Sequence, residues 1–151
     1  DSRLIQQWPE RIQDILNRYT QDDQCAWYFD FRIKAKGIKF RALERAVNLR
    51  SHWRQKPYGD QGLLISKNFY TQIGGYAPIH LMEDLDFAER ISKRAELKRL
   101  RMPIYTDGRK WEENGLIAQT WRNARFRQRW REGESTNTIS KDYRQIDRTI
   151  K

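Results

Sequence analysis

A pair of adjacent carboxylates, Glu83 and Asp84, stands where a helix is expected to begin. The apolar residues after them recur at helical spacing (Leu85, Ala88 and Ile91). Acidic side chains at a helix N-terminus cap unpaired amides and complement the helix dipole, which stabilises the helix by about 0.3–1 kcal/mol each. A carboxylate that faces a cleft can instead remove a proton from an incoming hydroxyl, if it is ionised and within hydrogen-bond reach. The residues alone leave both interpretations open, and capping is the commoner one.

A second group of polar residues lies between two glycines, ahead of an apolar run. Asp60 and Gln61 follow Gly59 and come directly before Gly62 and the apolar segment Leu63–Ile65. Carboxylate and amide groups bind sugar hydroxyls through directional hydrogen bonds. The same groups also cap turns and strands. We give these two interpretations equal weight.

Arg109 and Trp111 form a basic and aromatic element farther along the chain. The planar guanidinium of Arg109 can pair with two phosphate oxygens at once. Trp111 either stacks on a sugar face or fills the core, and core filling is the simpler interpretation. His80, just before the carboxylate pair, is more simply a hydrogen-bonded structural residue than a group that lines a cleft.

In order and spacing, these motifs resemble the second half of a family-2 glycosyltransferase. In that family an apolar strand, a helix end with an aromatic residue and two glycines, and an acidic pair opening a helix follow one another. Here they read GLLI, IGGY and LMED. With YGDQG before them and RKWE after them, the pattern is similar to a bacterial subgroup associated with arsenosugar biosynthesis. The resemblance extends over about residues 1–132 and depends on the agreement of several elements, each weak by itself.

The resemblance implies an α/β fold of the GT-A type and an inverting transfer of a sugar from a nucleotide-sugar donor to an acceptor hydroxyl, often on a lipid-linked acceptor. The aspartate of the acidic pair is the general base of the family, and it corresponds to Asp84. Glu83 then orients the acceptor or the adjoining loop. The other substrate-binding residues that the match implies are Gly59, Asp60 and Gln61 beside the sugar, and Arg109 and Trp111 near the donor diphosphate.

Asp1 matches the end of the family's acidic metal motif, so the resemblance implies a Mg²⁺ or Mn²⁺ ion there that bridges the donor diphosphate. The nucleotide-binding half normally precedes this motif. We therefore expect the acceptor-side half of an incomplete GT-A fold, with helices packed on a small mixed sheet and no transferase activity by itself. The missing strands are expected to leave an open apolar sheet edge, which favours a homo-oligomer.

The composition indicates a folded and strongly basic chain. It has 151 residues, a net charge of +10 at pH 7 and 13% aromatic residues, and few disordered sequences have so many rings. The lone Cys25 cannot form an internal disulfide, and with two histidines it cannot build a usual zinc cluster. No apolar run is long enough to span a bilayer and no signal peptide opens the chain. We expect a cytoplasmic protein, with peripheral contact at the inner face of the membrane.

Alternating helical and strand patterns predict the class α/β. Helices are expected over residues 8–19, 40–53, 68–73, 85–95 and 113–131, and strands over 25–33, 61–66 and 97–105, the last interrupted by Pro103. The strand over 25–33 is expected to bury one face, and the apolar strand over 61–66 to lie inside a sheet. Residues 1–132 are expected to form one domain, and residues 133–151 a polar tail.

The segment Trp121–Arg131 contains five arginines and three aromatic residues. Its simplest interpretation is a solvated amphipathic helix whose rings pack on the domain. The alternative function for the chain is a non-catalytic basic module that binds an anionic membrane surface, where each Lys or Arg contributes about 1 kcal/mol. Nucleic acid is the weaker form of this alternative, because no recognisable nucleic-acid-binding module is present.

Overall fold

The computed structural model describes residues 2–19, 24–108 and 116–149. The chain divides into two compact units. The first comprises residues 1–76 and 84–107, and the second comprises residues 77–83 and 108–151. This division does not follow the boundary expected at residue 132, because the segment after residue 108 belongs to the second unit as a whole.

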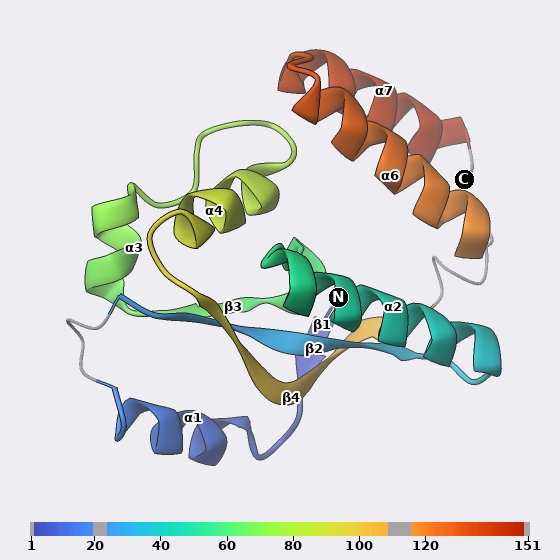
Figure 1. Ribbon diagram of the computed structural model, residues 1–151. Helices are drawn as coiled ribbons and strands as arrows, with labels where there is room; N and C mark the ends of the chain where they lie inside the picture. The colour runs from blue at the N-terminus through green and yellow to red at the C-terminus, as the bar shows by residue number, and fades with distance from the viewer. Residues whose placement is uncertain (1, 20–23, 109–115, 150–151) are drawn as a thin grey trace. The chain divides into compact units, whose positions relative to one another are not determined.

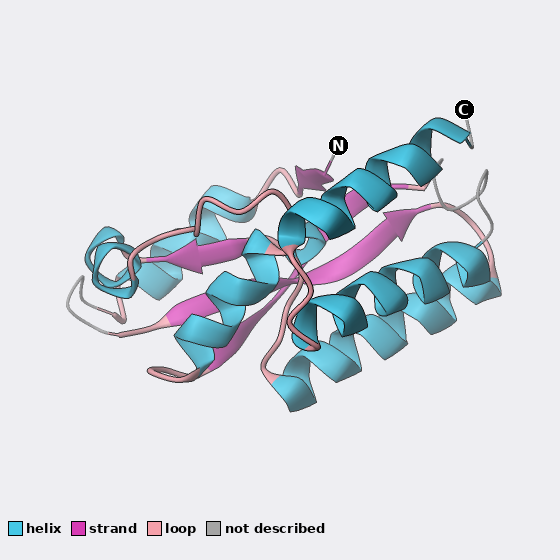
Figure 2. Cartoon of the chain, turned by 90° about the horizontal axis from the view of Figure 1, so that it is seen from above, coloured by secondary structure: helices cyan, strands magenta, loops and turns pink. Residues whose placement is uncertain are grey.

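A four-stranded mixed sheet lies in the first unit (Figure 1). Its strands are β1 (Ser2–Leu4), β2 (Ala26–Lys34), β3 (Leu63–Ile65) and β4 (Leu97–Asp107), in the order β1-β4-β2-β3. β2 and β4 are parallel, whereas β1 pairs with β4, and β3 with β2, in the antiparallel sense. The strands form one twisted layer (Figure 2). The predicted α/β class and the small mixed sheet are confirmed.

Helices cover both faces of this sheet. In the first unit they are α1 (Trp8–Leu16), α2 (Ile38–Arg54), the short 3₁₀ helix η1 (Gly59–Gln61), α3 (Lys67–Ile73) and α4 (Glu83–Ser92). The first residue of α4, Glu83, is counted with the second unit. α1 lies on one face, and α3 and α4 lie on the other (Figure 1). The Ser66 hydroxyl begins α3 by accepting a hydrogen bond from the Phe69 N–H at 3.2 Å, and Gly74 ends it with a φ of 86°. The glycine-terminated helix predicted from IGGY is therefore confirmed.

β2 is buried on both faces, so the prediction of a single buried face was wrong. On one face Tyr28 packs with Phe69 and Phe87. On the other face Phe29 packs with Ile12. β2 is a central strand with helices above and below it, and the alternation of aromatic residues did not reveal that the intervening side chains are buried as well.

β3 is an edge strand, whereas its apolar composition predicted a strand inside a sheet. Only Leu63–Ile65 pair with β2, and all three residues are half-buried. Leu63 and Ile65 pack on one core cluster and Leu64 packs on the other. The run is apolar because both of its faces contact core residues, although among the described residues β3 has a neighbouring strand on one side only.

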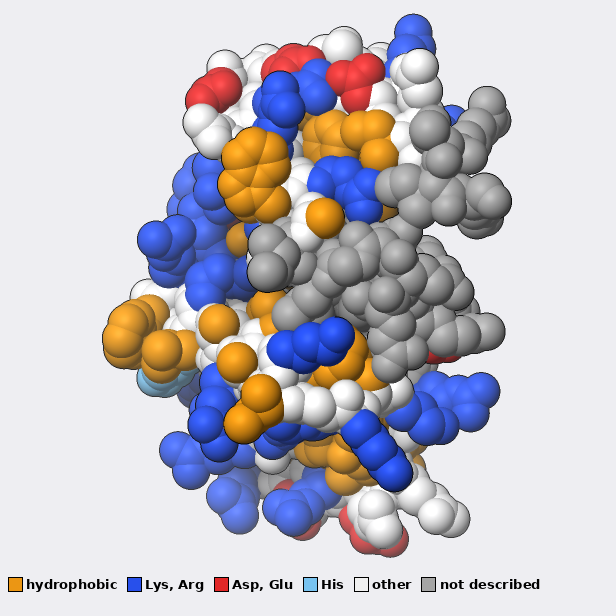
Figure 3. Space-filling model, turned by 90° about the vertical axis from the view of Figure 1, so that its right-hand side faces the viewer, with side chains coloured by type: hydrophobic (Ala, Val, Ile, Leu, Met, Phe, Trp, Pro, Cys, Tyr) orange, Lys and Arg blue, Asp and Glu red, His pale blue; other side chains and the backbone are white. Residues whose placement is uncertain are grey.

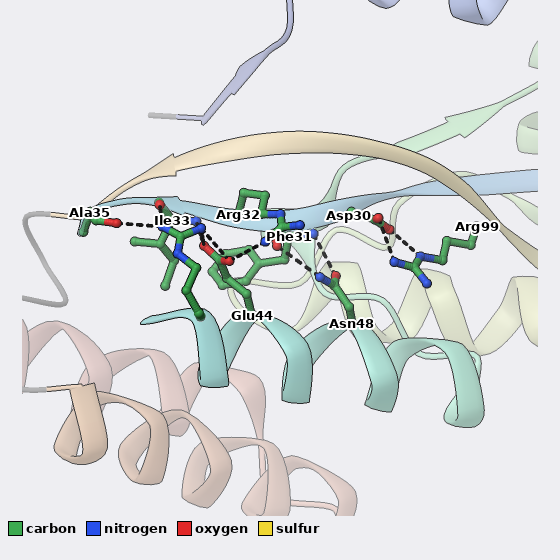
Figure 4. A network of polar contacts seen from close by, with 9 residues as sticks. Asp30, Phe31, Arg32, Ile33, Ala35, Glu44, Asn48 and Arg99 are labelled. Carbon is green, nitrogen blue, oxygen red and sulfur yellow. Dashed lines mark hydrogen bonds and ion pairs between the residues drawn. The ribbon is translucent and has the colours of Figure 1, made fainter. Parts of the chain in front are cut away.

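Beyond the end of β3, polar side chains of α2 pair with the backbone of β2 (Figure 4). The Asn48 side chain accepts a hydrogen bond from the Phe31 N–H at 2.8 Å and donates one to the Phe31 carbonyl at 3.1 Å. The carboxylate of Glu44 accepts a hydrogen bond from the Ile33 N–H at 2.8 Å. These side chains occupy the hydrogen-bonding positions of a neighbouring strand. We expected an open apolar sheet edge, but along this part of β2 the edge is covered by these polar side chains.

The carboxylate of Glu44 is fully buried and carries further partners. It forms ion pairs with Arg32 at 2.8 Å and with Arg41 at 2.7 Å. Arg41 also donates hydrogen bonds to the carbonyls of Ile33 and Ala35, at 3.2 and 2.7 Å. α2 is therefore attached to β2 by a charged network as well as by apolar packing.

The last strand was predicted to be interrupted at Pro103, but β4 runs through this residue from Leu97 to Asp107. The irregularity lies just before it: Tyr28 pairs with Arg99 and Asp30 with Pro103, so the register shifts between these two positions. Arg101, in the shifted stretch, has a φ of 54°. Pro103 itself keeps a partner position in the sheet, which a proline can occupy where its missing N–H is not needed by the ladder.

The second unit contains two helices, α6 (Leu116–Arg131) and α7 (Thr136–Thr149). α6 agrees with the helix expected over residues 113–131, as far as the chain is described. α7 corrects the prediction of a polar tail. Ile139 in α7 is fully buried, and the ring of Tyr143 lies 5.6 Å from that of Phe126 in α6. A few apolar residues at helical spacing suffice for a helix when a second helix covers them. Throughout the described residues, each helix is too short or too polar to cross a bilayer.

Candidate active site

The structure brings two of the sequence motifs together at the start of α4. One oxygen of Asp84, Oδ2, accepts a hydrogen bond from the Gly59 N–H at 2.5 Å, and the other, Oδ1, accepts one from the Leu85 N–H at 2.8 Å. Asp84 is half-buried. Each carboxylate oxygen has a second lone pair, so both retain an acceptor position. The carboxylate is thus oriented by backbone donors without being enclosed.

Position 59 favours glycine, because the Asp84 carboxylate lies against its backbone. A Cβ atom at position 59 would lie 3.1 Å from Asp84 Oδ2 and 3.4 Å from Asp84 Cβ. The first distance is shorter than an ordinary van der Waals contact, so a Cβ atom here would push the carboxylate oxygen away by a few tenths of an ångström. The contact with Asp84 therefore gives a steric reason for a glycine at the first glycine position of the YGDQG motif.

α4 begins directly after a residue with unusual backbone geometry. Met82 has a φ of 69°, in the left-handed region that residues other than glycine rarely adopt. Such a conformation costs on the order of 1–3 kcal/mol and persists only where the surrounding structure fixes it. Its position two residues before Asp84 sets the direction from which the chain enters α4.

Gln61 anchors the loop that carries Gly59. Its side chain is fully buried, and its Oε1 accepts hydrogen bonds from the Ser51 hydroxyl at 2.6 Å and from the Tyr58 N–H at 3.3 Å. Its Nε2 donates to the Phe29 carbonyl at 3.3 Å. Gln61 therefore links η1 to α2 and to β2, and its amide is used inside the protein. Its predicted contact with a substrate stays a prediction.

Further contacts that the sequence analysis did not foresee hold α4 and its loop in place. Arg90 of α4 donates hydrogen bonds to the carbonyls of Ile73 and Gly75, at 2.7 and 2.6 Å, and pairs with Asp86. This arginine fastens α4 to the end of α3. The sequence signal for this arginine was its spacing of four residues from Asp86, which predicts an ion pair along one helix. That spacing does not indicate that Arg90 also contacts the two carbonyls.

Two further cations, Lys56 and Arg50, contact α4 and the loop that carries Gly59. Lys56 pairs with Glu89 of α4 at 2.7 Å. The guanidinium of Arg50 lies 3.6 Å from the centroid of the Tyr58 ring, which is cation–π geometry. Tyr58 is the first residue of the YGDQG motif, so its aromatic type has a partner in α2.

The remaining predicted site residues are found in different places. Asp60 is half-buried within η1, and Glu83 is exposed at the first position of α4. Asp1, Arg109 and Trp111 lie outside the described residues, so their predicted roles stay predictions. Among the described residues, no group of three or more His, Cys, Asp or Glu side chains is arranged to hold a metal ion. We derive no chemical step through the implied Mg²⁺ or Mn²⁺.

Two cavities are found elsewhere. One, of about 240 Å³, lies between α1 and β4 in the first unit and is lined by Arg11, Arg18 and Arg101, among others. The other, of about 430 Å³, lies between α6 and α7 and is lined by Trp121 and Arg125, among others. Neither is lined by Asp84. A cleft for the proposed base is therefore not formed by either of these hollows.

Set against known proteins, the chain has no significant match to a family model, to a curated protein sequence or to a solved structure.

Proposed function

We propose that this chain is the acceptor-side part of an inverting family-2 glycosyltransferase, with the sheet and helices of an incomplete GT-A fold, and that Asp84 is its general base. The observation that carries the proposal is the Asp84 carboxylate, which the Gly59 and Leu85 amides hold in one orientation at the start of α4. The motifs YGDQG and LMED, separate in the sequence, meet at this one carboxylate.

In the proposed reaction, the acceptor hydroxyl approaches the sugar on the side opposite the leaving group. Its oxygen forms a bond to the anomeric carbon while the bond to the diphosphate oxygen breaks and the electron pair leaves with the nucleoside diphosphate. The proton of the hydroxyl passes to Asp84, which is within reach if the acceptor binds at the exposed side of the carboxylate. The configuration at the anomeric carbon is inverted because a single displacement takes place.

The residues around Asp84 contribute orientation. A base accelerates the displacement only when it, the acceptor and the donor are aligned, and small misplacements cost large factors in rate. Gln61, Arg90 and Lys56 fix the loop and the helix that carry Gly59 and Asp84. In this proposal Glu83, exposed beside the base, orients the acceptor.

The donor side of the site is part of the same proposal. Asp1 stays a proposed ligand of a divalent ion, and no step of the proposed reaction depends on that ion. Arg109 and Trp111 would contact the donor. We expect the chain to need a nucleotide-binding half for turnover, so the activity is to be tested in the complete enzyme.

The test is the Asp84→Asn variant of the complete enzyme, assayed by release of nucleoside diphosphate from a panel of nucleotide-sugars. Asn keeps the size of Asp but cannot accept the proton, and its single oxygen can accept from only one of the Gly59 and Leu85 N–H groups. We expect sugar transfer to be abolished, the thermal unfolding temperature to fall slightly because one hydrogen bond is lost, and the fold to be kept, which circular dichroism checks. Asp14→Asn, the same chemical change at an exposed residue of α1, is the matched control. Undiminished turnover in Asp84→Asn would refute the assignment.

A second candidate function is supported by the surface between α6 and α7. Trp121 is 69% exposed there, and α6 carries five arginines and no acidic residue. This supports the alternative of a basic module that binds an anionic surface. If it holds, Trp121→Ala combined with Arg125→Gln lowers binding of the chain to an anionic polymer such as heparin, whereas Asp84→Asn leaves that binding unchanged. Equal elution of the α6 variant and the wild type from heparin in a salt gradient would rule out this candidate.

A further inference from the structure

The outward face of α2 carries large apolar side chains that pack on nothing in the first unit. Ile38 is 90% exposed, Trp53 is 74% exposed and Leu49 is 48% exposed. In a helix each residue advances by about 100°. Ile38, Leu49 and Trp53 therefore fall within a sector of roughly 60°, although they span nearly the whole helix. The exposed Ala42 lies in the same sector.

This sector lies opposite the buried face of the helix. The buried residues of α2 are Phe40, Glu44 and Ser51. On the same helical wheel they centre roughly 180° from the sector of exposed apolar residues. One face of α2 is bound to β2 through Glu44 and Asn48. The opposite, outer face carries the exposed apolar residues.

Cations border the exposed apolar sector on both sides. Arg45 lies about 20° beyond one edge of it and Lys39 about 40° beyond the other, whereas Arg54, the last residue of the helix, lies about 100° beyond that second edge; all three are exposed. Arg45 and Arg54 make no hydrogen bond or ion pair with the residues that the structure describes, and Lys39 lies over the ring of Phe40. The only acid of α2, Glu44, is buried among its own partners. The outer face of the helix is therefore apolar along its centre and positive along its edges; Figure 3 shows a side of the molecule on which exposed hydrophobic side chains lie among Lys and Arg.

We propose that the outer face of α2 binds an anionic phospholipid surface, with Ile38, Leu49 and Trp53 entering the headgroup region and Lys39, Arg45 and Arg54 contacting the lipid phosphates. Helices that lie in the plane of a membrane have this arrangement of an apolar centre and cationic edges. Trp is favoured at the level of the headgroups because its ring is large and amphipathic. This surface belongs to the sheet-containing unit and is distinct from the arginine-rich α6.

Charge and shape favour lipid over the other occupants. A second copy of the chain docked through the same face would bring Lys39, Arg45 and Arg54 against their own equivalents, and like charges repel. The phosphates of a nucleic acid need cations, but the centre of this face presents apolar side chains to them. A protein groove would have to fit large side chains separated along the helix by small and charged ones. A lipid surface accepts such isolated side chains without matching their shape.

The test is cosedimentation of the full chain with vesicles of phosphatidylcholine, with and without phosphatidylglycerol, at low and high salt. We expect binding only with phosphatidylglycerol, and weaker binding at high salt. Replacing Lys39, Arg45 and Arg54 with Gln should lower the affinity about fivefold per cation, or roughly a hundredfold together. Leu49→Ala with Trp53→Ala should lower it by about tenfold or more. All five residues are exposed, so the variants are expected to fold, which circular dichroism checks.

Trp121→Ala in α6 is the matched control for Trp53→Ala, since both tryptophans are largely exposed. Unchanged vesicle binding in Trp121→Ala, together with a loss in the α2 variants, supports the proposal. Any of three results would overturn it: equal binding by the α2 variants and the wild type, loss of vesicle binding in Trp121→Ala alone, or an oligomer in size-exclusion chromatography that Trp53→Ala dissociates. Stronger binding to a DNA oligonucleotide than to the vesicles, unaffected by Trp53→Ala, would also overturn it. Asp84→Asn should not alter vesicle binding, so this test and that of the transferase are independent.

Discussion

The buried carboxylate of Glu44 offers the sharpest test of how α2 is held on the sheet. In Glu44→Gln the side chain keeps its shape, and its oxygen can still accept the hydrogen bond from the Ile33 N–H. Its amide nitrogen, however, faces the guanidinium groups of Arg32 and Arg41, which are donors too. The hydrogen bond from Arg32 is thus lost, whereas Arg41 Nη1, which also lies 2.7 Å from Oε1, keeps a contact with the remaining oxygen. Hydrogen bonds to a charged acceptor contribute about 1.5–3 kcal/mol each.

The magnitude has to be reduced for exposure to water. The side chains of Arg32 and Arg41 are 43% and 40% exposed, so each can regain water when the carboxylate is removed. We therefore expect Glu44→Gln to lower the free energy of unfolding by about 1–2 kcal/mol. Glu44→Ala should lower it by about 1–3 kcal/mol more, because the buried Ile33 N–H then loses its acceptor.

Urea unfolding, followed by far-ultraviolet circular dichroism, measures these changes if the transition is two-state. Glu96→Gln, the same chemical change at an exposed residue, is the control and should stay within about 0.5 kcal/mol of the wild type. If Glu44→Gln also stays within that margin, then the charged network does not hold α2 on β2. The positioning of Gln61 by Ser51 of α2 would then need another explanation.

Three further predictions follow from single contacts. Tyr28→Phe should raise the free energy of unfolding, measured in urea, by about 1 kcal/mol, because the buried Tyr28 hydroxyl finds no partner among the described residues. Burial also raises the pKa of Tyr28 above its usual 10.0. The wild type should therefore lose stability as the pH rises above that value, and the variant should lose less. Gly59→Ala should lower transfer by the complete enzyme about tenfold, because its Cβ displaces the Asp84 carboxylate; an unchanged rate would show that the close contact has no part in orienting the base. Arg129 of α6 lowers the pKa of the carboxyl of Glu134, in the connection to α7, below its usual 4.5, so this contact should be intact above that pH and weaken as the pH falls through the lowered value. The change should be visible in the helical ellipticity, and Glu134→Gln should not show it.

Local signals in the sequence predicted the parts of this fold that depend on neighbouring residues. Ser66 and Gly74 mark the two ends of α3, and Glu83 and Asp84 mark the start of α4, because caps act within one helical turn. Pro103 indicated an irregularity of β4 but not its place, since the register shifts just before the proline and the strand runs through it.

Features that depend on distant packing were not predicted. Nothing near Gln61 in the sequence shows that its amide turns inward to Ser51 and Phe29. In the same way, an apolar run does not reveal whether β3 has one neighbouring strand or two. The sequence around Ile139 gave too weak a pattern for α7, because the helix depends on α6 to cover it.

Of the candidate site, the sequence singled out two motifs, and the structure adds how residues of the two meet. The spacing of YGDQG and LMED did not by itself require that a backbone amide of one contact the carboxylate of the other. The side chains that brace this contact, Arg90 and Lys56, were not foreseen, because each acts through a partner on another element.

The short hydrogen bond between Gly59 and Asp84 also gives the molecule a built-in spectroscopic reporter. An amide hydrogen so close to a carboxylate oxygen is deshielded, so its nuclear magnetic resonance signal should stand apart from those of the other glycines. An acceptor alcohol that approached the same oxygen atoms would move this one resonance first, before any product had formed.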